Sequence, residues 1–208
     1  NAIMNEGELN DHILIAYARE DWEDWLTQHD STDSISASIH QVKNLESLGA
    51  EVLPVAADVT VAEQMRDVVT VATDRFGSVN GVFHTAGVVR DNLIQLKSPR
   101  EIEEVFAAKL YGTMVLDELF RESNLDFMLL FSSTSAIIAP QGQVDYVGAS
   151  AFVNAFAAAC NGKRPYKVCA VNWGIWKDVG MVAPGADGTG ATENEFHNAT
   201  QEPISYPL

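Results

Sequence analysis

The fold is decided by residues 125–173, in which two apolar runs flank an alanine-rich segment. The first run reads LDFMLLFS (125–132), the middle segment QVDYVGASAFVNAFAAAC (143–160), and the last run YKVCAVNW (166–173). Short, continuous apolar runs are typical of buried strands, and the middle segment has the length of a helix. The stretch therefore predicts two strands joined by a helix, and that connection makes the strands parallel.

The same alternation of short apolar runs and longer helical patterns continues toward the N-terminus. Pro99 suits the first turn of a helix, and Thr60 suits a cap. We therefore predict an α/β protein with a doubly wound, Rossmann-like parallel sheet covered by helices on both faces. The remaining strands are predicted at 12–18, 51–57 and 79–85, and the remaining helices at 20–26, 31–48, 61–76 and 99–122.

Composition limits the class of protein. With 208 residues, of which 47% are apolar, the chain suits one domain with a substantial core. It contains no apolar run long enough to span a membrane, and its formal charge of −16 argues against nucleic acid as a partner. Two cysteines, Cys160 and Cys169, are too few for a disulfide scaffold, which favours a reducing cytoplasm. We interpret residues 1–3 as a tag remnant, 4–175 as the domain and 176–208 as a loop or interdomain linker.

Four polar residues of the C-terminal half are candidates for catalysis. Ser133 follows a predicted strand, at the edge of the sheet where open α/β proteins bind ligands. Tyr146 and Ser150 lie one turn apart at the start of the next helix, and Lys109 lies on the preceding one. Each residue taken alone has a structural explanation, such as core packing, a solvated helix face or a turn. Their joint spacing favours one site.

The segments around these residues resemble the ketoreductase domain of modular polyketide synthases, a branch of the short-chain dehydrogenase superfamily. The resemblance covers about residues 11–181 and involves several ordered blocks, which together are far more specific than one block alone. The blocks are FSS (131–133), QGQVDYVGASAF (141–152), HTAGV (84–88), AKLYGT (108–113), VNWGIW (171–176) and REDWE (19–23).

The resemblance implies hydride transfer from NADPH to a β-ketoacyl thioester on an acyl carrier protein. Tyr146 would donate the proton, Ser133 would hydrogen-bond the substrate oxygen, and Lys109 would lower the pKa of Tyr146. Ser150 stands where the family usually has asparagine, so any relay through this position has only one short hydroxyl. The implied site for NADPH consists of Arg19, which would bind the 2′-phosphate, and of Asp58, Val59, Ala86, Gly87, Lys109, Tyr146, Asn172, Trp173 and Gly174.

The N-terminal part departs from the family, which begins with a strand, a Gly-rich turn and a helix that hold the pyrophosphate. The first strand predicted here, at 12–18, corresponds to the second strand of the family. We therefore expect a sheet that lacks the first strand, the Gly-rich turn and the helix. Such a chain should bind NADPH weakly and show little or no reductase activity by itself, and its bared sheet edge favours dimerisation.

Three functions stay open at this stage: a ketoreductase domain beside other synthase domains, a non-catalytic pseudo-ketoreductase with a structural role, and a free-standing short-chain reductase. The linker-like tail argues against the free-standing reductase. The retained Lys109, Ser133 and Tyr146 favour catalysis, whereas the missing turn favours the pseudo-ketoreductase. For the product, residues 90–92 (RDN) partly match the Leu-Asp-Asp motif of enzymes that form the D-alcohol, and Ile138 replaces the tryptophan of the opposite type.

Overall fold

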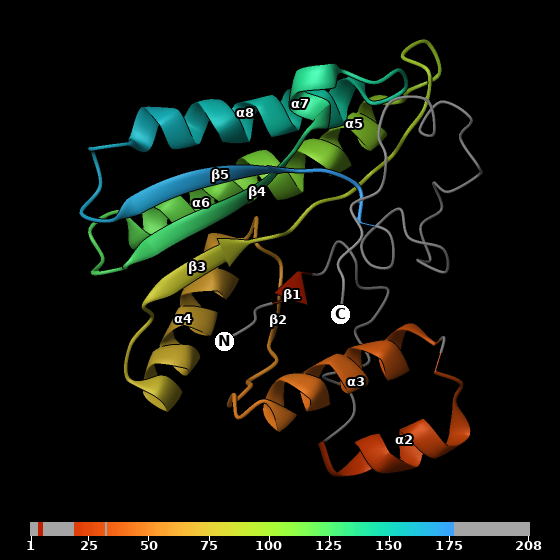
Figure 1. Ribbon diagram of the computed structural model, residues 1–208, viewed down its shortest axis with the longest axis vertical. Helices are drawn as coiled ribbons and strands as arrows, with labels where there is room; N and C mark the ends of the chain where they lie inside the picture. Colours follow the sequence, from red (N-terminus) through yellow and green to blue (C-terminus); the bar gives the residue numbers. More distant parts are fainter. Residues whose placement is uncertain (1–3, 6–18, 32, 177–208) are drawn as a thin grey trace.

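Residues 81–173 contain a parallel sheet of three strands (Figure 1). Strand β4, Phe127–Ser133, lies between β3, Gly81–His84, and β5, Lys167–Trp173. The register pairs His84 with Leu130 and Ser133 with Trp173. The predicted parallel arrangement is confirmed, and the carboxyl ends of the three strands lie at one edge.

The computed structural model describes residues 4–5, 19–31 and 33–176, so the predicted strand 12–18 and residues 177–208 lie outside the described part. A second, shorter ladder pairs β1, Met4–Asn5, with β2, Ala56–Ala57, in parallel. The sequence did not predict β1. Of the predicted strand at 51–57, the described part of the structure shows Ala56–Ala57 as paired.

Helices pack on the sheet through one shared cluster of buried side chains. Met128 and Leu130 of β4 are fully buried and contact residues from three helices, α4, α6 and α8. Within the described ranges these helices cover one face of the sheet, and on β3 Phe83 remains 58% exposed. The helices are η2 (Arg19–Asp21), α2 (Trp22–Gln28), α3 (Ser34–Ser47), α4 (Ala62–Phe76), α5 (Pro99–Phe106), η3 (Ala107–Tyr111), α6 (Gly112–Phe120), α7 (Ser135–Ile138) and α8 (Val144–Cys160).

The helix ends show where sequence signals hold and where they fail. Ser98 and Glu101 form a complete capping box at the start of α5, with Pro99 in the first turn as predicted. Thr60, however, does not cap α4. Its amide and hydroxyl both donate to the Asp58 carboxylate, at 2.8 and 2.7 Å, and α4 begins after Val61 without a side-chain cap. The Thr60 hydroxyl is thus used in a local hydrogen bond to Asp58, before the helix begins, and does not cap the helix.

The predicted continuous helix at 99–122 is interrupted. Residues Ala107–Tyr111 form the π turn η3, in which the amide of Gly112 bonds to the carbonyl oxygen of Ala107. Sequence periodicity does not reveal a single wide turn between two ordinary helices. None of the helices in the described ranges has both the length and the apolar character that a membrane crossing requires.

Candidate active site

Lys109 lies within the π turn, and the turn directs its side chain into the protein. The residue is 3% exposed, and its Nζ atom donates a hydrogen bond to the carbonyl oxygen of Phe131 at 2.7 Å. Burial lowers the pKa of Lys109 to about 8. π turns occur frequently at functional sites. This one places a buried cation beside the carboxyl end of β4.

The π turn packs closely on the end of the sheet because Gly112 follows it. A Cβ atom at Gly112 would lie 2.8 Å from Cγ1 of Val59 and 3.1 Å from Cε1 of His84. Both neighbours are themselves buried. Only a residue without a side chain therefore allows this approach of the helix to the strands.

Tyr146 and Ser133 meet Lys109 at the same place. Ser133 ends β4, Tyr146 lies in the first turn of α8, and the Ser133 side chain is near enough to lower the pKa of the Tyr146 phenol. The Nζ atom of Lys109 lies 5.1 Å from the centroid of the Tyr146 ring. Tyr146 is 8% exposed and Ser133 is 9% exposed. The structure thus brings together the three residues that the sequence grouped.

The pKa of Tyr146 is raised overall, and a lowering by Lys109 is not among the causes, so that role of Lys109 stays a prediction. Burial is the largest cause, the negative charge of Asp91 adds to it, and the nearby Ser133 side chain opposes it. The ammonium of Lys109 faces the tyrosine ring and donates to Phe131, which directs its hydrogen bond away from the phenol oxygen. Tyr146 is therefore a protonated phenol at neutral pH.

Ser150 is placed one turn after Tyr146 and is fully buried. Its hydroxyl has no hydrogen-bond partner within the described part of the chain. Its carbonyl oxygen accepts a hydrogen bond from the Ser132 hydroxyl at 3.0 Å. Among the described residues the Ser150 side chain is therefore not connected to Lys109 or Tyr146.

The first part of the predicted cofactor site has local partners. Arg19 forms an ion pair with Glu46, and its guanidinium lies 5.1 Å from the centroid of the Trp22 ring. Asp58 holds the turn before α4, as described above. Val59 is 6% exposed and belongs to the core cluster between sheet and helices. Each of these residues has a structural role that accounts for its position.

The second part of the predicted cofactor site lies at the carboxyl ends of the strands. Ala86 and Gly87 follow β3 and are buried. Asn172 accepts a hydrogen bond from Asn154 at 2.9 Å, and the carbonyl oxygen of Trp173 accepts one from the Thr134 amide, also at 2.9 Å. The register of β4 and β5 pairs Ser132 with Asn172 and Ser133 with Trp173, and Gly174 follows directly.

His84 also belongs to this region, although it was not among the candidate site residues of the sequence analysis. It is 5% exposed, its ring packs close to Gly112 at the end of the π turn, and its Nε2 atom has no hydrogen-bond partner among the described residues. Burial, followed by the charge of Lys109, lowers its pKa to about 4. A neutral imidazole therefore supports the turn that carries Lys109.

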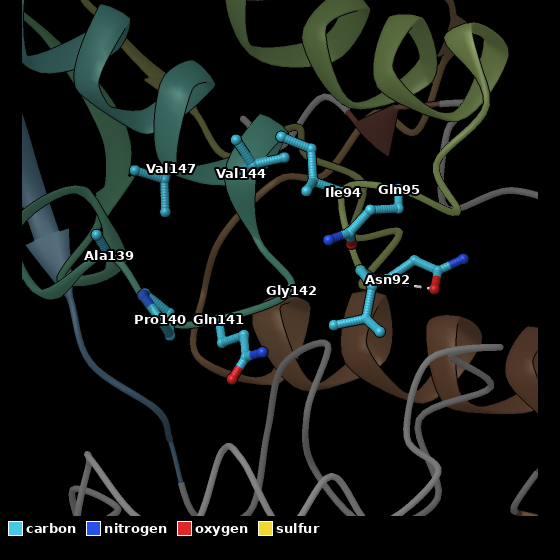
Figure 2. Close-up of a pocket in the computed structure, with 10 residues that line it drawn as sticks. Asn92, Ile94, Gln95, Ala139, Pro140, Gln141, Gly142, Val144 and Val147 are labelled. Atoms are coloured by element: carbon cyan, nitrogen blue, oxygen red, sulfur yellow. Dashed lines mark hydrogen bonds between the residues drawn. The ribbon is translucent and has the colours of Figure 1, made fainter.

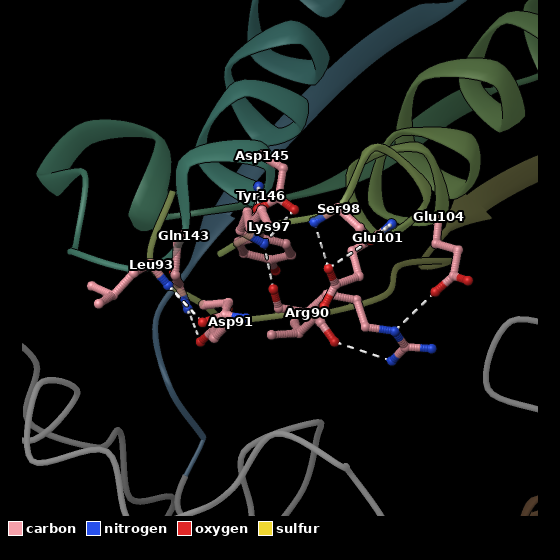
Figure 3. Close-up of polar contacts among 12 residues, drawn as sticks. Arg90, Asp91, Leu93, Lys97, Ser98, Glu101, Glu104, Gln143, Asp145 and Tyr146 are labelled. Carbon is pink, nitrogen blue, oxygen red and sulfur yellow. Dashed lines mark hydrogen bonds and ion pairs between the residues drawn. The ribbon is translucent and has the colours of Figure 1, made fainter. Parts of the chain in front are cut away.

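A polar network beside Tyr146 was not predicted from the sequence (Figure 3). The Nζ atom of Lys97 lies 2.6 Å from the Oδ2 atom of Asp145, and their side chains are 0% and 1% exposed. The amide of Gln143 donates to Asp91 at 2.8 Å and its carbonyl oxygen accepts from Ser135 at 2.9 Å. The paired residues are up to 52 positions apart, so no local pattern reveals them.

A cavity of about 530 Å³ opens next to this network (Figure 2). One wall is the loop that follows β3, and the other wall is the turn and first residues of α8. Its lining is apolar apart from side-chain amides. The lining residues are Asn92, Leu93, Ile94, Gln95, Ala139, Pro140, Gln141, Gly142, Val144 and Val147.

The described residues contain no group of three or more histidine, cysteine, aspartate or glutamate side chains placed to hold a metal ion. The polar atoms at the site are instead a phenol, a hydroxyl and an ammonium. Such groups can supply a proton and stabilise a developing negative charge on an oxygen atom.

Comparison with known proteins identifies the family. The KR domain family model matches residues 12–178. The polyketide synthase PksM of Bacillus subtilis (strain 168) is 39% identical over 141 residues, which cover 68% of this chain and 3% of that protein. A ketoreductase domain from the bacillaene assembly line superposes with a TM-score of 0.64 at 35% identity, over 68% of this chain and 35% of that one.

A crystal structure of an N-terminal ketoreductase from the macrolactin assembly line gives the same result. It superposes with a TM-score of 0.64 at 38% identity, covering 67% of this chain and 29% of the other. The chain thus spans only a small part of the relatives it matches. The parallel sheet, the three converging residues and these matches lead to one conclusion: the chain belongs to the ketoreductase domains of polyketide synthases.

Proposed function

We propose that the chain acts in the NADPH-dependent reduction of a β-ketoacyl thioester, held on an acyl carrier protein, to the β-hydroxyacyl thioester. The observation that carries this proposal is the convergence of Lys109, Ser133 and Tyr146 at the carboxyl end of β4. The apolar cavity at the start of α8 supports it, because an acyl chain needs an apolar wall near the reacting carbonyl.

Each of the three residues has a role that suits its surroundings. Tyr146 is the proton donor, and its raised pKa keeps the proton on the phenol until negative charge develops on the substrate oxygen. Ser133 donates a hydrogen bond to the same oxygen. Lys109 stabilises the phenolate that remains after proton transfer, because its cation faces the ring of Tyr146.

The residues near the strand ends fit a nicotinamide dinucleotide. NADPH, when bound, supplies the hydride. The indole Nε1 of Trp173 is buried and has no hydrogen-bond partner among the described residues, so it can donate to a polar ligand group. Ala86 and Gly87 allow a close backbone approach. Arg19 is the candidate for the 2′-phosphate, and binding there requires it to leave Glu46.

A single-turnover experiment tests the proposed function. Because we expect weak NADPH binding and low activity from the chain by itself, the 208-residue chain is used in excess over a β-ketoacyl N-acetylcysteamine thioester and with saturating NADPH. Mass spectrometry should then detect slow formation of the β-hydroxyacyl product. Tyr146→Phe should slow product formation about 10²- to 10⁴-fold, because general acid catalysis contributes this much. Tyr111→Phe is the matched control, since Tyr111 is 42% exposed and lies on the outer side of the π turn.

Two results would contradict the proposal. Equal product formation by the wild type and Tyr146→Phe would remove the phenol from the reaction. A complete lack of reduction by a folded wild type that binds NADPH would favour a non-catalytic, structural role for this member of the family.

A further inference from the structure

The buried ion pair between Lys97 and Asp145 lies directly beside the proposed proton donor. Its two side chains are 0% and 1% exposed, and the Nζ–Oδ2 distance is 2.6 Å. Taking two charges out of water is costly, so a buried pair is weak evidence for stability by itself. The segments that the ion pair connects are therefore more informative about its role than its contribution to stability.

On one side, Lys97 closes a loop. Its ammonium also donates a hydrogen bond to the carbonyl oxygen of Arg90, so it joins the first and last residues of the segment 90–97. The following residue, Ser98, caps α5 through its capping box with Glu101, which fixes the end of the segment to a helix. Figure 3 shows the two contacts of the Lys97 ammonium, one with Asp145 and one with the carbonyl oxygen of Arg90.

On the other side, Asp145 holds the backbone of Tyr146. Its Oδ1 atom accepts a hydrogen bond from the Tyr146 amide at 2.9 Å, while its Oδ2 atom binds Lys97. Amides in the first turn of a helix have no partner within the helix. The carboxylate supplies one, and it does so in the turn that carries the phenol.

The two connected segments are the walls of the apolar cavity. Residues 92–95 form one wall, and residues 139–147 form the other (Figure 2). They are also joined by the amide of Asn92, which donates to the carbonyl oxygen of Gly142 at 3.0 Å, and by the contact of Gln143 with Asp91. Among these contacts, the ion pair combines full burial with a direct bond to Tyr146.

We propose that Lys97 and Asp145 are positioning residues, which set the place of Tyr146 relative to the wall formed by residues 90–97. The inference rests on the proposed function only for the role of Tyr146 as proton donor. A misplacement of about 1 Å can lower a reaction rate about 100-fold. The position of the Tyr146 phenol relative to the substrate carbonyl is therefore important for the rate.

The test distinguishes an effect on the position of Tyr146 from an effect on the stability of the whole protein. Lys97→Met combined with Asp145→Leu removes both charges while keeping similar volumes, so the protein should remain folded. We expect hydrogen exchange of residues 90–97 and of the Tyr146 amide to become about tenfold faster or more. The ¹³Cζ resonance of Tyr146, which is assigned by its absence from the spectrum of Tyr146→Phe, should also shift.

The matched control is the double variant Asp117→Leu with Arg164→Met, which removes the contact between α6 and the segment after α8, remote from Asp145. It should leave the hydrogen exchange and the Tyr146 resonance unchanged.

A second double variant tests the two contacts separately. Lys97→Met with Asp145→Asn keeps an oxygen acceptor for the Tyr146 amide, so this amide should regain its protection while residues 90–97 still exchange fast. Wild-type exchange and an unmoved Tyr146 resonance in Lys97→Met with Asp145→Leu would overturn the proposal. If that protein does not fold, wild-type exchange of residues 90–97 in Lys97→Met with Asp145→Asn would overturn it instead.

None of these measurements depends on turnover. Failure of the wild type to reduce a thioester would therefore count against the proposed function and leave the positioning role standing. In an active protein, the Lys97→Met/Asp145→Leu variant should lose about 100-fold in kcat with little change in KM, because the cavity lining itself is intact. Full activity in this stable variant would contradict the positioning role.

Discussion

The ammonium of Lys109 lies 5.1 Å from the centroid of the Tyr146 ring, and both side chains are buried. Burial acts on the two groups in the same sense, because it disfavours the charged form of each. It lowers the pKa of the lysine to about 8 and raises the pKa of the tyrosine. At neutral pH the pair therefore holds a cation beside a neutral acid.

Replacing Lys109 by methionine should stabilise the protein while it removes activity. The pKa of Lys109 lies below its unfolded value, so the folded state binds this proton less tightly and the cost of burying the cation is largest below about pH 8. We expect Lys109→Met to raise the free energy of unfolding by about 1–3 kcal/mol near neutral pH. This gain should shrink as the pH rises toward about 10.5, where both states of the wild type lose the proton. Urea unfolding at several pH values measures it, and a destabilised variant would contradict the expectation.

His84 should make the protein sensitive to mild acid. Its pKa is lowered to about 4, so the unfolded state takes up a proton at a higher pH than the folded state does. Stability should therefore fall as the pH drops from about 6.5 to about 4, by about 3 kcal/mol from this group. His84→Asn keeps a polar side chain that does not titrate, and the difference between its unfolding free energy and that of the wild type should change across this window. A constant difference would show that His84 does not titrate as described.

Two glycines should respond to alanine in opposite ways. Gly112→Ala places a Cβ atom 2.8 Å from Val59 in a packed core, so we expect a loss of about 1–3 kcal/mol in unfolding free energy. At Gly148 in α8 the same atom would meet Phe106 at 3.8 Å, an ordinary contact. Gly148→Ala should therefore gain up to about 1 kcal/mol from helix propensity. Denaturant unfolding of both variants decides the matter, and a stabilised Gly112→Ala would refute the packing argument.

The configuration of the product is a further expectation. Residues 90–92 partly match the motif of enzymes that form the D-alcohol, and Asp91 receives a hydrogen bond from Gln143 close to Tyr146. We predict a D-configured β-hydroxyacyl product. Chiral chromatography of the reduced thioester provides the answer, and the L-alcohol would contradict it.

The sequence predicted well whatever depends on local pattern. The strands around β4 and β5 follow from apolar runs, and Ser133 and Tyr146 could be placed near each other because a strand end and a helix start are joined by a short connection. Lys109 could be grouped with them through its spacing and through the resemblance of its segment to a known family. Its orientation comes from the π turn, which has no signature in the order of apolar and polar residues.

Contacts between distant residues explain most of what the sequence missed. Lys97 reads as an ordinary solvated lysine, and only the folded chain shows that it lies against Asp145 with no exposed side-chain surface. Likewise, Arg19 is a plausible phosphate ligand by position, but whether Glu46 on α3 reaches it depends on how two helices pack. The sign of the pKa change at Tyr146 depends on burial, which no single residue determines.

The π turn also means that the number of residues between α5 and α6 is constrained more strictly than the identity of those residues. An α-helix advances about 100° per residue, so removing one residue between Ala107 and Tyr111 would let α5 and α6 merge into a regular helix. Everything on one side of the deletion would then rotate by about this angle relative to the other side. Lys109 could not face Phe131 while both helices kept their present contacts. A single-residue deletion in this turn should therefore disturb the fold more than a substitution of the exposed Tyr111 does.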